Sequence, residues 1–126
     1  MVAEHVRRYI DLLTGRYRSI SSIWLMGSRA SSTERPESDW DLLAFADGDA
    51  LIEMQGDPAV RAPGIDLLVV IDGDRFEQPW IDEGEISPKF GYLDVWRWTQ
   101  NSQAEATYLS SRNQQTVPAM RLWPSE

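Results

Sequence analysis

Two aspartates with a single residue between them, Asp39 and Asp41, stand at the start of an apolar run in this 126-residue sequence. Side chains in a β-strand alternate between its faces, so a strand here would project both carboxylates to one side, about 7 Å apart along the backbone. Carboxylates placed in this way can share a cation. Mg²⁺ suits them best, because it is usually held by one or two carboxylates together with substrate phosphates. The alternative interpretation is a solvated acidic turn ahead of the strand.

A second candidate group, Gly27-Ser28, directly follows the apolar run of residues 23–26. The glycine permits close approach of the backbone, the serine supplies a hydroxyl, and N–H groups are free if a helix begins there. These are the groups that a triphosphate needs, although they are equally compatible with a simple tight turn. Arg29 either leans over the phosphates or lies on the surface. A phosphate cradle and a carboxylate pair in one short segment together indicate nucleotidyl transfer.

These residues resemble the signature of the DNA polymerase β-like nucleotidyltransferase superfamily, which places Gly-Ser ahead of a strand with an Asp-x-Asp pair. The minimal nucleotidyltransferases, often called MNT proteins, are the members closest in size. The resemblance covers roughly residues 20–72, and where many members carry a further glycine this chain has Ala30-Ser31-Ser32. It implies an α+β fold, a small mixed β-sheet with helices packed on it, that uses Mg²⁺ and ATP or another NTP. The matching segments are Gly27-Ser28 and Ser38-Asp39-Trp40-Asp41-Leu42-Leu43.

A third carboxylate, Asp66, lies within the apolar run of residues 64–70. A carboxylate inside such a strand costs several kcal/mol unless it is paired, coordinated or facing water. The superfamily has a third acid on the strand after the aspartate pair, so the resemblance implies that Asp66 completes the metal site. There it would also accept a proton from the attacking hydroxyl. Asp94 is the second candidate for this role.

By resemblance, the expected reaction moves a nucleoside monophosphate, AMP from ATP, to an acceptor hydroxyl. MNT proteins commonly act as antitoxins beside a HEPN-type partner, which they adenylylate. Two alternatives are transfer to a small molecule such as an aminoglycoside, and a binding module that keeps the fold without catalysis. A single small domain offers half a cleft, so we also expect a homodimer or a complex with a second protein.

The bulk properties fit one globular domain over residues 1–126, with 42% hydrophobic residues and no apolar run long enough to span a membrane. A net charge of −8 makes nucleic acid an improbable partner, because phosphate binding relies on Lys and Arg. The start of the chain lacks the order of a secretory signal, and the sequence has no cysteine. A cytoplasmic location is therefore expected.

Hydrophobic periodicity predicts the elements that would position these residues. In the first part of the chain it indicates a helix over 3–14 capped by Gly15, strands over 21–26, 39–46 and 65–71, short helices over 29–34 and 50–55, and a turn at 47–49. The later part is predicted as a partly helical stretch over 75–84, a strand over 90–99 that places Trp96 and Trp98 on one face, and a helix over 103–112 that begins with the capping box at Ser102. From residue 113 a polar tail is expected to lie over the surface.

Overall fold

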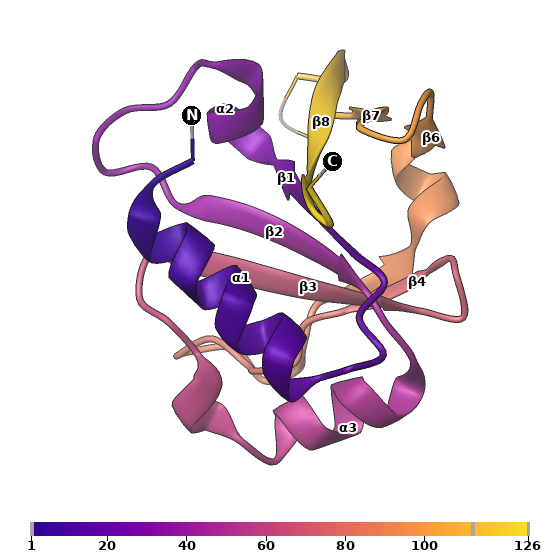
Figure 1. Cartoon of the computed structure of the whole chain (residues 1–126). Coiled ribbons are helices and arrows are strands. Elements are labelled where there is room, and N and C mark those ends of the chain that lie inside the picture. Colours follow the sequence, from indigo (N-terminus) through magenta and orange to yellow (C-terminus); the bar gives the residue numbers. More distant parts are fainter. Residues whose placement is uncertain (1, 112, 126) are drawn as a thin grey trace.

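The computed structural model describes residues 2–111 and 113–125, which form a mixed α+β fold (Figure 1). The helical elements are α1 (Glu4–Arg16), α2 (Gly27–Ser31), α3 (Gly48–Gln55) and the 3₁₀ segments η1 (Pro58–Val60) and η2 (Leu93–Trp96). The strands are β1 (Ser22–Met26), β2 (Trp40–Phe45), β3 (Ile65–Ile71), β4 (Arg75–Glu77), β5 (Phe90–Tyr92), β6 (Thr99–Gln100), β7 (Glu105–Leu109) and β8 (Thr116–Trp123).

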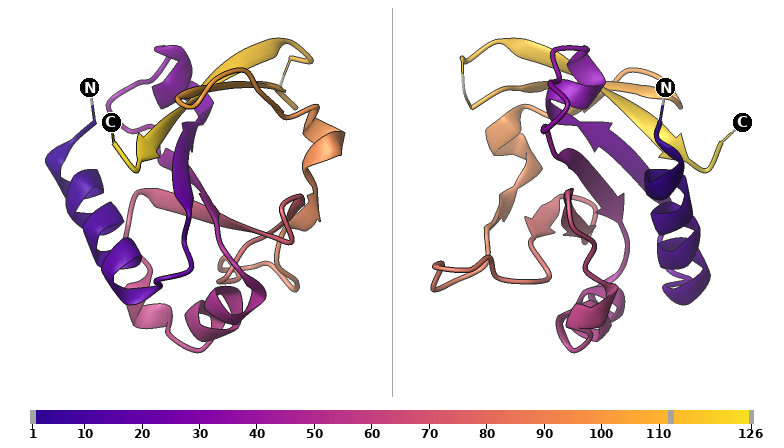
Figure 2. Two further views of the ribbon diagram at one scale, coloured as in Figure 1. Left: turned by 45° about the vertical axis from the view of Figure 1, so that its right-hand side comes forward. Right: turned by 90° about the vertical axis from the view of Figure 1, so that its left-hand side faces the viewer.

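All of these strands belong to one eight-stranded sheet with the order β5-β4-β3-β2-β1-β8-β7-β6. The β2–β3 pair is parallel, and the other neighbours run antiparallel. The two edge strands, β5 and β6, follow each other in the chain and are joined through η2. The sheet therefore curls, and the left view of Figure 2 shows η2 spanning between its two ends. The curl gives the sheet an outer face and an inner face.

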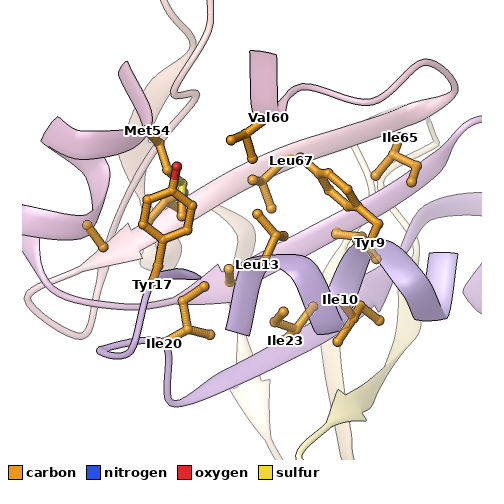
Figure 3. Close-up of a cluster of buried hydrophobic side chains, with 14 of the residues drawn as sticks. Tyr9, Ile10, Leu13, Tyr17, Ile20, Ile23, Met54, Val60, Ile65 and Leu67 are labelled. Atoms are coloured by element: carbon orange, nitrogen blue, oxygen red, sulfur yellow. The ribbon is translucent and has the colours of Figure 1, made fainter. Parts of the chain in front are cut away.

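The outer face carries the larger buried cluster, formed with α1 and α3 (Figure 3). Four residues of α1 recur at helical spacing and all are buried against the sheet, which is the pattern of an amphipathic helix on a core. They meet the alternate outward side chains of the central strands. The α1 residues are Val6, Tyr9, Ile10 and Leu13, and their partners in the sheet include Ile23, Leu42, Leu67 and Val69.

The inner face holds a second cluster that is rich in aromatic side chains. Trp98 is partly buried and packs against this cluster: its ring meets that of Trp24 edge-on at 5.4 Å between centroids, and it lies 6.0 Å from the Phe45 ring and 6.4 Å from the Tyr108 ring. Because side chains alternate along each strand, the residues of β2 and β3 that join this face are Leu43, Phe45, Leu68 and Val70. The polar residues that follow the same alternation lie on the inner face as well.

The predicted strands over 21–26, 39–46 and 65–71 correspond to β1, β2 and β3, and the predicted helix over 3–14 corresponds to α1. Three details of this region were wrong. Helix α1 continues through Gly15 to Arg16, and α2 begins directly at Gly27. The expected turn at 47–49 is the start of α3, because the Asp47 side chain caps the helix by accepting a hydrogen bond of 2.9 Å from the Ala50 amide.

The prediction fails more broadly after residue 72. Residues 75–84 contain no helix; they begin with β4, and the segment 90–99 is divided between β5, η2 and β6. Trp96 therefore ends a 3₁₀ turn and does not share a strand face with Trp98. The helix expected over 103–111 is β7, and its last predicted residue, 112, lies outside the described residues. Ser102 does accept hydrogen bonds from the Ala104 and Glu105 amides, but this turn leads into a strand.

The C-terminal segment is the largest correction. The tail that was expected to lie over the surface forms β8, which pairs with β1 on one side and β7 on the other. Burial explains this position: Ala119 on β8 and Ala106 and Tyr108 on β7 alternate with exposed residues and fill the inner cluster. The C-terminal hairpin is thus an internal part of the sheet.

Candidate functional site

Asp41 and Asp66 lie directly beside each other on the inner face of the sheet. They are register partners across the parallel pair β2–β3. Asp41 lies two residues before Leu43 and Asp66 two residues before Leu68, and because side chains alternate along a strand, both carboxylates share the inner face with these leucines. The Asp66 carboxyl is close enough to raise the pKa of Asp41. Asp39 immediately precedes β2 and interacts electrostatically with both. The structure therefore brings together all three carboxylates selected from the sequence.

The electrostatics of this acid cluster, defined as Asp39, Asp41 and Asp66, are unfavourable for its charged state. Burial raises the pKa of Asp41 to about 6, and the negative charges of Asp66 and Asp39 add to that effect. Partial desolvation also raises the pKa of Asp66, followed by the charges of Asp39 and Asp82. A cation bound between Asp41 and Asp66 would offset this repulsion and favour their charged forms.

The donor chemistry of the cluster fits Mg²⁺ through a pair of carboxylates. Among residues 2–111 and 113–125, no three His, Cys, Asp or Glu side chains are already arranged as a metal site. Asp39 and Asp66 are exposed and Asp41 is half-buried, and Asp41 and Asp66 are register partners on neighbouring strands. Since Mg²⁺ commonly uses only one or two carboxylates and completes its octahedral shell with water and phosphate oxygens, two paired carboxylates are a sufficient protein contribution.

Gly27 packs against Asp41 at the junction of β1 and α2. Its φ angle is +72°, and a side chain added to it would overlap the Asp41 carboxylate. The Gly27 N–H donates a hydrogen bond of 2.7 Å to the Tyr108 hydroxyl, which reaches the site from β7. Glycine is thus required twice here, for its backbone conformation and for the space that Asp41 occupies. Ser28, the next residue of α2, is half-buried beside this contact.

Arg29 lies on the other face of the sheet from the acid cluster. Its guanidinium stands 4.5 Å from the centre of the Trp40 ring, and Trp40 belongs to the outer cluster. Arg29 Nη2 also donates to the Ser38 carbonyl at 2.9 Å. These contacts fix the loop that leads into β2, so Arg29 here supports the position of Asp39 and does not face the carboxylates.

Asp94 is separate from the acid cluster. It is exposed in the first turn of η2, the segment that joins β5 to β6. It is not among the groups that shift the pKa of Asp41 or Asp66. Of the two candidates for the third carboxylate, only Asp66 lies beside Asp41.

The segment 78–89 forms a wall beside the acid cluster, which sequence reasoning did not foresee. Gln78, a buried polar residue, donates to Asp82 at 3.0 Å, and Arg61 forms an ion pair with Asp82. The charge of Asp82 contributes to the raised pKa of Asp66, so this wall stands close to the carboxylates. A surface hollow of about 530 Å³ is lined partly by this wall, and another of about 460 Å³ lies beside the start of α1; the acid cluster lines neither.

Comparisons of the chain with protein-family models, curated proteins and solved structures return no match. Its function is therefore inferred from the arrangement of its own residues. Within the described part of the chain, none of the helices combines the length and the apolar character needed to cross a lipid bilayer.

Proposed function

We propose that this chain has a nucleotidyltransferase-like core and is a Mg²⁺-dependent nucleotidyltransferase that moves AMP from ATP to an acceptor hydroxyl. The observation that supports this most strongly is the in-register pairing of Asp41 and Asp66 across β2 and β3. Gly27, the first residue of α2 directly after β1, leaves room for the Asp41 carboxylate. Two adjacent carboxylates beside a glycine-serine turn are suited to hold a metal-bound triphosphate.

In this proposal Asp39, Asp41 and Asp66 hold Mg²⁺, which would stabilise the negative charge of the phosphates. Asp66 would also accept the proton of the acceptor hydroxyl. The acceptor oxygen then bonds to the α-phosphorus. The bond from the α-phosphorus to the bridging oxygen breaks, and pyrophosphate leaves with that electron pair.

The decisive experiment compares Asp66→Asn with Asp94→Asn in an assay of labelled AMP transfer. Asp66→Asn should abolish transfer, because it removes the proton acceptor, and should also weaken Mg²⁺–ATP binding, because it removes one of the two paired carboxylates. Asp94→Asn should change neither, because Asp94 lies in η2 and is not paired with Asp41 across the strands. Loss of transfer in Asp94→Asn with a silent Asp66→Asn would overturn the assignment of the third carboxylate.

The acceptor would belong to a second protein, as in the HEPN pairing that the sequence resemblance implies. The acid cluster lines neither of the two surface hollows, so a partner surface or a second copy of the chain would supply the remaining wall. Co-purification with a candidate partner, followed by AMP transfer to it, tests this. A strictly monomeric protein that transfers AMP to a free small molecule would contradict it.

A nucleotide-binding module without catalysis is the second candidate. Two observations favour it: no three-residue metal site is preformed among the described residues, and the Gly27 amide already has Tyr108 as its partner. Calorimetric titration of ATP with Mg²⁺ and then with EDTA separates the two. Metal-dependent binding followed by AMP transfer supports the enzyme, whereas metal-dependent binding without any transfer supports the module.

A further inference from the structure

Lys89 is the only lysine in the sequence, and every other strongly basic side chain is an arginine. It lies at the end of the wall segment 78–89, immediately before β5. The chain has a net charge of −8 and carboxylates throughout its sequence. The position of its single lysine relative to the acid cluster is therefore worth establishing.

The strand alternation places Lys89 on the inner face of the sheet. Gly91, two residues later, faces the Phe76 ring, which lies 2.9 Å from where a glycine side chain would begin. Phe76 belongs to the inner cluster, so Gly91 and Lys89 share that face. Lys89 is therefore on the same face of the sheet as Asp41 and Asp66.

The hydrogen-bond ladder places Lys89 at the level of the acid cluster as well. Gln78 donates its N–H to the Lys89 carbonyl at 2.8 Å, and the Lys89 N–H donates to Gln78 Oε1 at 3.2 Å. Strand β4 pairs with β3 through Glu77 and Val69, so Gln78 and Lys89 continue the sheet toward the Asp66 end of β3. Both hydrogen bonds use the backbone of Lys89, which leaves its ammonium group for other interactions.

The charge of Lys89 acts on the site without being neutralised by a single partner. The positive charge of Lys89 lowers the pKa of Asp41, Asp66 and Asp82. For Asp41 and Asp66 the opposite effect of burial is larger, so their pKa values are raised overall. Among the described residues, Lys89 takes part in none of the close ion pairs. The ammonium thus stands near several carboxylates and is bound tightly by none of them.

We propose that Lys89 binds the phosphate chain of the nucleotide from the β4–β5 side of the acid cluster. This inference rests on the proposed function and names a phosphate-contacting residue that the sequence motif does not contain. A triphosphate approaching several carboxylates is repelled unless positive charge faces it, and a lysine ammonium is a flexible point charge well suited to phosphate oxygens.

The test is calorimetric titration of the full chain with inorganic triphosphate in the presence of Mg²⁺. Lys89→Gln should weaken binding by about tenfold, the effect of losing one charge-assisted contact. Arg18→Gln is the matched control, because Arg18 is exposed, lies just after α1 on the outer side and changes the net charge equally. It should stay within about twofold of the wild type, and Lys89→Arg should retain most of the affinity.

A second measurement uses the uniqueness of Lys89. A lysine-selective acylating reagent followed by peptide mass spectrometry should modify Lys89 more slowly when Mg²⁺ and triphosphate are present than with Mg²⁺ alone. The inference is overturned if the wild type does not bind triphosphate, if Lys89→Gln matches Arg18→Gln, or if Lys89→Gln binds more tightly. Failure of AMP transfer with Lys89-dependent triphosphate binding would instead count against the proposed enzyme and leave the Lys89 site intact.

Discussion

The Asp41 carboxylate occupies the space that a side chain on Gly27 would need: a Cβ atom added to Gly27 would overlap with Asp41 Oδ2. They come from neighbouring elements: Gly27 begins α2 directly after β1, and Met26, the last residue of β1, is the register partner of Asp41 on β2. The identity of residue 27 therefore controls where the Asp41 carboxylate lies. This contact joins the glycine-serine turn directly to the acid cluster.

Gly27→Ala should destabilise the fold and displace Asp41. The positive φ of +72° costs about 1–2 kcal/mol for any residue with a side chain, and the overlap with Asp41 adds to this. Gly73→Ala is the matched control, because Gly73 has a φ of +80° and open space around it. Urea unfolding should show a larger loss for Gly27→Ala, and only this variant should also lose Mg²⁺-dependent ATP binding. Equal losses in both variants would mean that the Asp41 contact is unimportant.

The stability of the metal-free protein should fall as the pH rises through about 6. Burial holds the pKa of Asp41 in the folded protein above its value in the unfolded chain, so the folded state binds the carboxyl proton more tightly. This difference stabilises the fold at low pH, and the stabilisation is lost as the pH rises through the folded pKa. Asp41→Asn removes the charge and should be about 1–2 kcal/mol more stable than the wild type at pH 7.5, a value reduced by solvent screening of a partly exposed group.

The measurement is urea unfolding in EDTA at pH 4 and pH 7.5. The advantage of Asp41→Asn should largely disappear at pH 4, where the wild-type carboxyl is also neutral in the folded state. Asp47 offers an opposite control, because its hydrogen bonds with the Ala50 amide and the Ser19 hydroxyl lower its pKa, and its contribution is lost as the pH falls. An advantage of Asp41→Asn that is the same at pH 4 and pH 7.5 would contradict the buried charge at Asp41.

Tyr108→Phe should destabilise the protein, because the candidate site depends on a hydrogen bond to the C-terminal hairpin. The change removes only the hydroxyl that accepts the Gly27 hydrogen bond of 2.7 Å and leaves the ring in the inner cluster. An amide left without a partner in a half-buried position costs about 1–3 kcal/mol. Thermal unfolding should show that loss. Tyr92→Phe, at an exposed position on β5, should be silent, and an equally silent Tyr108→Phe would argue that water replaces the hydroxyl.

Hydrogen exchange should show β8 to be as protected as the central strands. Its amides pair with β1 and β7, and the Arg121 amide donates to Ala104 at 2.9 Å. Exchange at Ala119 and Arg121 should therefore require opening of the sheet and match that of Leu42 and Leu43 in β2. Exchange within seconds at these β8 positions would restore the expectation of a surface tail.

The first 71 residues could be read from the sequence because their signals are local. Alternation and apolar content define β1, β2 and β3, and helical spacing defines α1. The parallel strand pair then places Asp41 and Asp66 together by geometry alone. The contacts of Arg29 could not be predicted in this way. Arg29 packs on Trp40, and this contact depends on which side of the sheet the loop after α2 crosses.

The C-terminal third could not be read in the same way because its local signals are ambiguous. Ser102 and Glu105 have the form of a helix cap, yet the following residues alternate in burial with a period of two, as a strand does. That alternation between Ala106 and Tyr108 was the signal that could have identified β7. Nothing local indicates that β8 pairs with β1, and so the roles of Tyr108 and Lys89 depend on tertiary structure.

The insertion of β8 beside β1 also determines when this protein can become complete during synthesis. Strand β1 is made early, but one of its edges has no partner until residues 116–123 have left the ribosome. Until then the nascent chain presents an open edge of an apolar strand, a feature prone to pairing with other chains. Gly27 obtains its contact with Tyr108 at the same late stage. The Gly27–Tyr108 contact and the second edge of β1 are therefore completed only after residues 116–123 have been synthesised.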